Sequence, residues 1–118
     1  MALVENRIEN GIVIGIFTKG NIVDLPTAVK MVNERLEFQN GVDYPIMICL
    51  NGLKFASSEA RNYMQKEGLK GLKAGAFIVT NPVEKVIMNF LLYVSPPSIP
   101  ARMFTNEKDA LEWLEQYK

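Results

Sequence analysis

The 118-residue chain contains no histidine and only one cysteine, Cys49. The lack of histidine excludes serine–histidine and cysteine–histidine nucleophile pairs, histidine-containing zinc sites and the commonest general base. One cysteine makes neither an internal disulfide nor a thiolate metal cluster. Its place in the apolar segment 46–50 predicts a buried thiol. Because a single cysteine forms no internal disulfide, a reducing, cytoplasmic compartment is expected. We therefore expect no metal, no cofactor and no enzymatic activity.

An excess of charge and long hydrophobic runs are also absent. Thirteen basic and thirteen acidic residues give a net charge of zero, so no nucleic-acid partner is expected. No apolar run approaches the ~20 residues of a membrane-spanning helix. The first residues lack the basic and apolar regions of a secretory signal. The sequence predicts a single domain over residues 1–118, with no membrane span and a cytoplasmic location.

Strand and helix signals alternate along the chain. Two strands between about residues 2 and 18 meet at Asn10-Gly11, a strong hairpin signal. Asp24 caps a helix that ends at Asn40-Gly41. The elements expected after it are strand 46–50, helix 58–67, strand 73–80, helix 83–94, strand 101–104 and a last helix capped by Thr105 or Asn106. This order predicts an α/β fold: a mostly parallel five-stranded sheet with an antiparallel first strand and four helices.

The element order resembles that of the STAS domain, the fold of bacterial anti-sigma-factor antagonists. The resemblance is sharpest in segment 49–60, where Asn51-Gly52-Leu53 and Phe55 match the family in character. It implies a right-handed βα superhelix and places Ser58 on the serine that the family phosphorylates. Ser57 and Ala60 stand where the family has aspartate and glycine. The chain resembles more closely a divergent STAS-like group of small bacterial proteins, as Asn81-Pro-Val and segments 100–104 and 107–114 indicate.

Two serines stand where an apolar strand passes into a helix. Ser57 is well placed as the N-cap of that helix, with Glu59 near the positive end of the helix dipole. A phosphate on Ser58 would lie near the same end, although Glu59 would repel it. Lys54 and Arg61 are candidates to read a phosphate or carboxylate there, or they are solvated surface residues. A structural cap, a docking surface and a phospho-switch all remain open.

Two functions from different classes follow. The first is a non-catalytic regulatory domain that docks a protein partner through the loop and helix start at 51–61. The second is a module that binds a small apolar, lipid-like ligand with the helix 83–94 and the sheet, because STAS folds resemble the lipid-transfer (CRAL-TRIO) domains.

The helix expected at 83–94 also predicts self-association. Its broad apolar face would cover the sheet, which leaves Met88 and Leu92 together on the opposite face. An adjacent exposed apolar pair marks a contact site, so we expect a homodimer with Met88 and Leu92 at its interface. The alternative is that both residues pack under the proline-rich loop 95–100.

Overall fold

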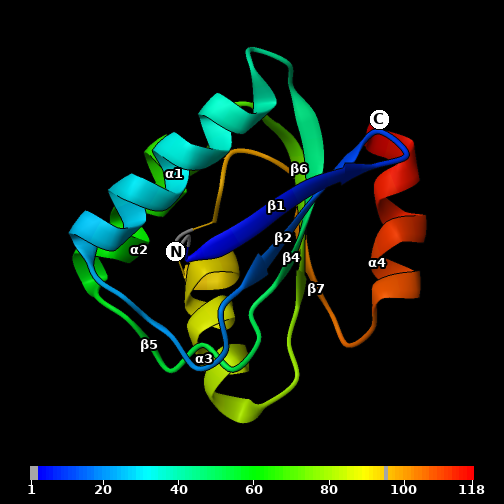
Figure 1. Ribbon diagram of the computed structural model, residues 1–118. Helices are drawn as coiled ribbons and strands as arrows, with labels where there is room; N and C mark the ends of the chain where they lie inside the picture. The colour runs from blue at the N-terminus through cyan, green and yellow to red at the C-terminus, as the bar shows by residue number, and fades with distance from the viewer. Residues whose placement is uncertain (1–2, 95) are drawn as a thin grey trace.

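A five-stranded sheet forms the centre of the computed structural model, which describes residues 3–94 and 96–118 (Figure 1). The strand order is β1-β2-β4-β6-β7, in which β1 is antiparallel to β2 and all other neighbours are parallel. The strands are β1 (Val4–Glu9), β2 (Ile12–Phe17), β4 (Tyr44–Cys49), β6 (Leu72–Ile78) and β7 (Ala101–Phe104). The mixed α/β sheet predicted from the sequence is confirmed.

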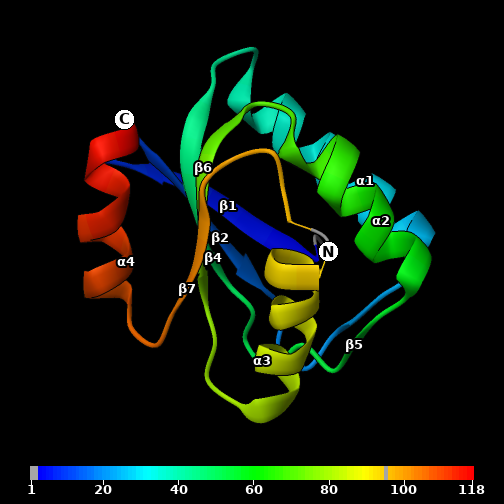
Figure 2. The ribbon, with the colours of Figure 1, turned by 180° about the vertical axis from the view of Figure 1, so that it is seen from behind.

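Three helices cover one face of this sheet and a fourth covers the other (Figures 1 and 2). α1 (Leu25–Gln39), α2 (Ser58–Lys66) and α3 (Pro82–Asn89) lie together, and α4 (Glu107–Leu114) lies on the opposite side. The first three each connect two neighbouring parallel strands. Because such crossovers share one hand and advance in one direction across the sheet, their helices share one face.

Side-chain caps set the start of every α-helix in the described chain. Each cap accepts a hydrogen bond from the backbone N–H three residues later, at 2.9–3.1 Å. The caps are Asp24, Ser57, Asn81 and Asn106. The hairpin between β1 and β2 turns at Asn10 and Gly11, whose φ values of 53° and 78° are the left-handed pair that this tight turn requires. Local signals therefore fix most element boundaries.

The secondary structure differs from the expected elements in two places. Strands β3 (Ile22–Val23) and β5 (Phe55–Ala56) pair in parallel as a separate two-stranded ribbon, which the sequence did not indicate. The α-helix predicted over 83–94 ends at Asn89, and a π-helical segment, Phe90–Val94, continues it.

The predicted orientation of this helix is wrong. Met88 and Leu92 are only 2% and 7% exposed and pack in the core, whereas Val83 and Val86 are 50% and 69% exposed. The cause is Glu84, a charged residue of the kind that usually faces solvent. Its side chain is fully buried, so the helix turns the face with Glu84 and Met88 inward.

Candidate functional site

An apolar cavity of about 130 Å³, partly open to solvent, lies between the sheet and helices α1–α3. Residues of one sheet face form its floor, among them Phe17, Ile48 and Phe77. Its walls come from the helices and from the segment before β7, including Met64, Leu91 and Ile99. Almost all of the lining is hydrocarbon, which favours an apolar occupant over water.

Two glycines within the strands leave room for this cavity. Gly15 on β2 pairs with Ile48, and Gly75 on β6 pairs with Ile46, all on the cavity side of the sheet. A Cβ added at Gly15 would approach Asn6 Oδ1 to 3.4 Å, and one at Gly75 would approach Phe77 to 3.2 Å. Glycine inside a strand weakens it and is often found where a ligand approaches the backbone.

A buried arginine, Arg35, is part of the cavity lining. Arg35 on α1 is 7% exposed and donates hydrogen bonds to the Gln39 side chain and, at 3.0 and 2.9 Å, to the carbonyls of Gly68 and Lys70. Burial lowers the pKa of Arg35 to about 10, still far above neutral pH. These acceptors are all neutral, and they tie α1 to the turn before β6.

A buried carboxylate holds the loop that follows β4. Glu84 accepts hydrogen bonds from the backbone N–H groups of Gly52 (2.5 Å) and Thr80 (2.8 Å), and from Asn81 Nδ2 (3.0 Å). The first of these joins α3 to the loop 51–54. Leu53 of the same loop points inward and lines the cavity, so this loop is also a cavity wall.

The four residues predicted around the serines lie close in the chain but make separate contacts. Ser57 Oγ accepts the Ala60 N–H at 3.1 Å as the cap of α2, and Ser58 is exposed. The Arg61 guanidinium donates to the Ala56 carbonyl at 2.6 Å and stacks 4.6 Å from the centre of the Phe90 ring.

Lys54, the fourth of these residues, is exposed and lies over Gly20 in the turn before β3. Neither Arg61 nor Lys54 is therefore directed at Ser58. The contacts of Arg61 join the start of α2 to the π-helical segment after α3.

Two apolar side chains are exposed beside this junction. Ile22 and Phe55 pair across the β3–β5 ribbon and are 60% and 54% exposed. Their neighbours in sequence, Val23 and Ala56, are fully buried. The ribbon thus has one face in the core and one face of large apolar groups in solvent.

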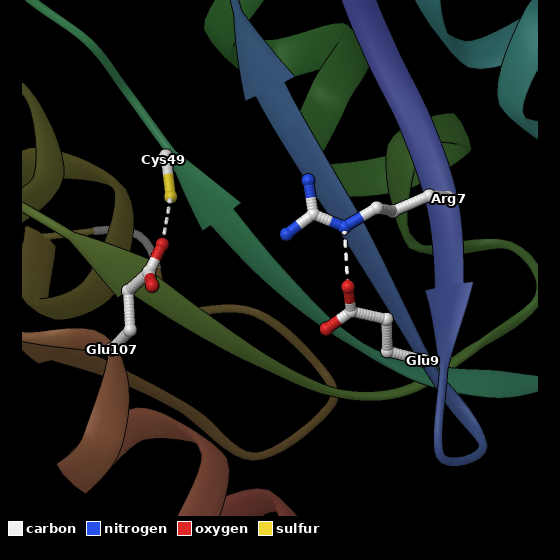
Figure 3. Close-up of polar contacts among 4 residues, drawn as sticks. All are labelled: Arg7, Glu9, Cys49 and Glu107. Atoms are coloured by element: carbon white, nitrogen blue, oxygen red, sulfur yellow. Dashed lines mark hydrogen bonds and ion pairs between the residues drawn. The ribbon is translucent and has the colours of Figure 1, made fainter.

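Cys49 lies at the end of β4 on the opposite side of the sheet, where its Sγ is 3.7 Å from Glu107 Oε1 (Figure 3). Partial burial, and next the negative charge of Glu107, raise the pKa of the thiol to about 11. Arg7 opposes this weakly, and its guanidinium pairs with Glu9 at 2.9 Å. The thiol is therefore protonated at neutral pH and a poor nucleophile.

The sequence suggested an apolar ligand site at the helix 83–94 and the sheet, but it did not point to the residues that shape the cavity. Gly15 and Gly75 interrupt β-branched and apolar runs, and an isolated glycine in a strand is itself a signal of close approach. Asn6 faces the cavity from β1 and carried no signal, because the strand pattern around it is polar. The burial of Glu84 carried no signal either, because its partner Gly52 lies 32 residues earlier in the chain.

Neither a metal site nor a membrane-spanning helix is found among the described residues. Among those described, no three histidine, cysteine, aspartate or glutamate side chains are grouped as ligands for a metal ion. No helix within 3–94 and 96–118 combines the length and hydropathy needed to cross a bilayer.

Comparison with known proteins bears on the family and the fold. Residues 6–118 match the family described as Domain of unknown function (DUF7793). No curated protein matches the sequence. Among solved structures, the chain is similar to an uncharacterized protein of the DUF3478 family with a SpoIIAA-like fold from Shewanella loihica PV-4. The identity is 17% and the TM-score 0.63, over 94% of this chain and 91% of that one. At this identity the likeness shows the fold alone, which is STAS-like.

Proposed function

The chain belongs to the DUF7793 family, and we propose that it is a non-catalytic binding domain that holds a small apolar molecule between its sheet and helices α1–α3. The observation that carries this proposal is the cavity of about 130 Å³ with an apolar lining. An empty cavity of this kind lowers stability, because its lining atoms lack van der Waals partners. Two strand glycines that maintain the space add a further cost.

The walls of the cavity include flexible side chains that can adjust to a bound ligand. Met31 of α1 and Met64 of α2 are half-buried and line it, beside Pro97. Methionine is unbranched and flexible, so it adjusts to an occupant at little cost. Next to them, Leu91 of the π-helical segment accepts a hydrogen bond from Gln65 of α2 at 2.8 Å. This bond keeps α2 and the end of α3 together along the cavity.

Native mass spectrometry of freshly purified protein, combined with toluene titration, tests this function. We expect a retained small molecule, or a melting temperature that toluene raises. Ala101→Leu extends a side chain into the cavity from β7 and should abolish either effect. Arg102→Leu places the same group on the opposite face of β7 as a control. A clean apo mass with no response to toluene contradicts the proposal.

A protein-docking role for the loop and helix start at 51–61 is the second candidate. It is favoured by the exposed pair Ile22 and Phe55 on the β3–β5 ribbon. Ser57, Ser58, Lys54 and Arg61 border this ribbon in sequence, and Arg61 connects it to Phe90. Exposed large apolar groups that adjoin more apolar surface are typical of contact sites.

Paired variants separate docking from ligand binding. A protein captured by the wild type should be lost with Phe55→Asp and retained with Tyr93→Asp, which changes another exposed aromatic residue outside the loop. Loss with both variants, or with neither, argues against this surface.

Self-association, if the chain dimerises as expected, requires a different face from the one predicted. Met88 and Leu92 are buried in the single chain, so the exposed Val83 and Val86 of α3 are the candidates in their place. Light scattering after size exclusion should give a dimer for the wild type and a folded monomer for Val86→Glu. A monomeric wild type at high concentration contradicts dimerisation.

A further inference from the structure

One polar side chain faces the cavity without a hydrogen-bond partner. Asn6 projects from β1 into the lining, half-buried, and its Oδ1 lies beside Gly15 of the neighbouring strand. No residue of the described chain hydrogen-bonds to its amide group, whereas the other polar lining residues, Arg35 and Gln65, both make hydrogen bonds. Asn6 is thus distinct among the groups that a ligand would meet.

The strand position makes this asparagine unusual. Asparagine is disfavoured in β-strands, and an amide group facing hydrocarbon is costly unless it is paired. Gly15, which pairs with Asn6, has no side chain, and the place where its Cβ would stand is 3.4 Å from Asn6 Oδ1. A ligand hydroxyl placed there would be within reach of Oδ1, and the same side-chain amide carries an N–H donor for a carbonyl.

The volume limits the size of the ligand. An engineered apolar cavity of roughly 150 Å³ in another protein takes up benzene. The cavity here, at about 130 Å³, therefore suits a molecule with one ring rather than the acyl chain of a membrane lipid. The cavity volume therefore restricts the lipid-like ligand class expected from the sequence to smaller molecules.

The charged groups around the cavity favour a neutral ligand. Arg35, the one cation among the described lining residues, already donates to the Gln39 side chain and to two backbone carbonyls. No carboxylate lines the cavity to receive a cationic ligand. A cationic ligand would lose its hydration without gaining an opposite charge, and an anionic ligand would have to compete with the neutral acceptors that hold Arg35.

We infer that the cavity takes a compact, uncharged, ring-sized molecule that is apolar except for one hydroxyl or carbonyl group, which hydrogen-bonds to the Asn6 amide. This inference rests on the proposed function and specifies its ligand class. Asn6 is the specificity-determining residue, and the hydrocarbon walls supply most of the affinity.

Phenol and toluene are matched probes for this inference, since they differ by a hydroxyl in place of a methyl group. Titration of each into isotope-labelled protein, followed by amide chemical shifts, gives both affinities. Phenol should bind the wild type more tightly than toluene. Asn6→Leu should weaken phenol about tenfold, the scale of one hydrogen bond, and leave toluene within about twofold. Glu5→Gln, on the other face of β1, should change neither.

Each other outcome has a defined meaning. If toluene binds and phenol is insensitive to Asn6→Leu, the inference fails while the proposed function stands. If neither probe binds, both fail. Benzoate binding more tightly than phenol would overturn the neutral ligand in favour of Arg35. If Asn6→Leu does not fold, Asn6→Val removes the same amide with a side chain that strands favour.

Discussion

The two faces of the sheet are covered by unequal numbers of helices, and the apolar cavity lies on the face with more of them (Figures 1 and 2). On one side α4 alone lies on Ala74 and Ala76, both fully buried, and contributes the fully buried Ala110 and Leu114. On the other side three helices surround a cavity above Gly15 and Gly75. Small residues have opposite effects on the packing of the two faces. Under α4 they permit close approach, and under α1–α3 they leave space.

Aromatic packing sharpens the contrast. Trp113 of α4 contacts Phe104 and Tyr117 with ring centroids 5.6 and 5.0 Å apart, in tilted and edge-on arrangements. Such pairs stabilise beyond their buried area. We therefore assign stability mainly to the α4 face and ligand binding to the three-helix face.

Truncation of leucines on the two faces should show the largest difference. Leu114→Ala, in the α4 face, should lower the free energy of unfolding by about 3 kcal/mol, because it opens a cavity in a filled core. Leu91→Ala, in the half-buried wall of the existing cavity, should cost about 1–2 kcal/mol. Urea denaturation measures both. Equal losses would remove the distinction in packing.

Removal of the buried carboxylate should give the next largest effect. Glu84→Ala leaves the N–H groups of Gly52 and Thr80 without their acceptor and should cost about 2–3 kcal/mol. The exposed Glu37→Ala should change stability by less than about 0.5 kcal/mol. If the two variants melt together, Glu84 does not hold the loop.

Methyl groups added on the two faces should change the free energy of unfolding in opposite directions. Gly15→Ala should raise the free energy of unfolding by about 0.5–1 kcal/mol, because its Cβ finds room at 3.4 Å from its neighbours and the unfolded chain loses freedom. Ala76→Val should lower it by about 1–3 kcal/mol by overpacking beneath α4. Thermal denaturation measures both signs, and destabilisation by Gly15→Ala would mean that the space beside it is not free.

Cys49 should give the smallest effect, a change of reactivity. With a pKa of about 11 against the ordinary 9.0, its thiolate is about a hundredfold scarcer near pH 8, so iodoacetamide should alkylate it slowly. Glu107→Gln removes a negative charge and should speed the reaction.

The same shift gives a pH dependence. Because the folded pKa is the higher one, this thiol contributes stability that is complete below about pH 9 and is lost as the pH rises towards 11. Rapid alkylation of the wild type at pH 8 would contradict the buried environment, as would a stability that holds unchanged through this pH range.

Much of the fold was readable from local signals. The Asn10-Gly11 turn, the caps Asp24 and Asn81, and the alternation of strand and helix led to the observed sheet, since each is decided by neighbouring residues. The orientation of α3 about its own axis could not be predicted from local signals. It depends on Glu84 meeting Gly52, which is 32 residues earlier in the chain.

The sequence predicted the general position of the candidate site but not the residues that form it. The predicted ligand-binding function used the helix 83–94 and the sheet, and both line the cavity. Ile87 and Leu91 of the expected face take part, but so do Met88 and Leu92, which were expected to be exposed. A cavity is a sum over many distant side chains, so no single segment records it. The position of Asn6 beside Gly15 likewise arises only when β1 pairs with β2.

The most direct measurement is a toluene titration of isotope-labelled wild-type protein, with amide shifts followed on both faces of the sheet. The account predicts saturable shifts at Gly15, Ile48 and Gly75, and little change at Ala110 and Leu114 of α4. Shifts spread equally over both faces, or none at all, would contradict the claim that the three-helix face is a ligand site.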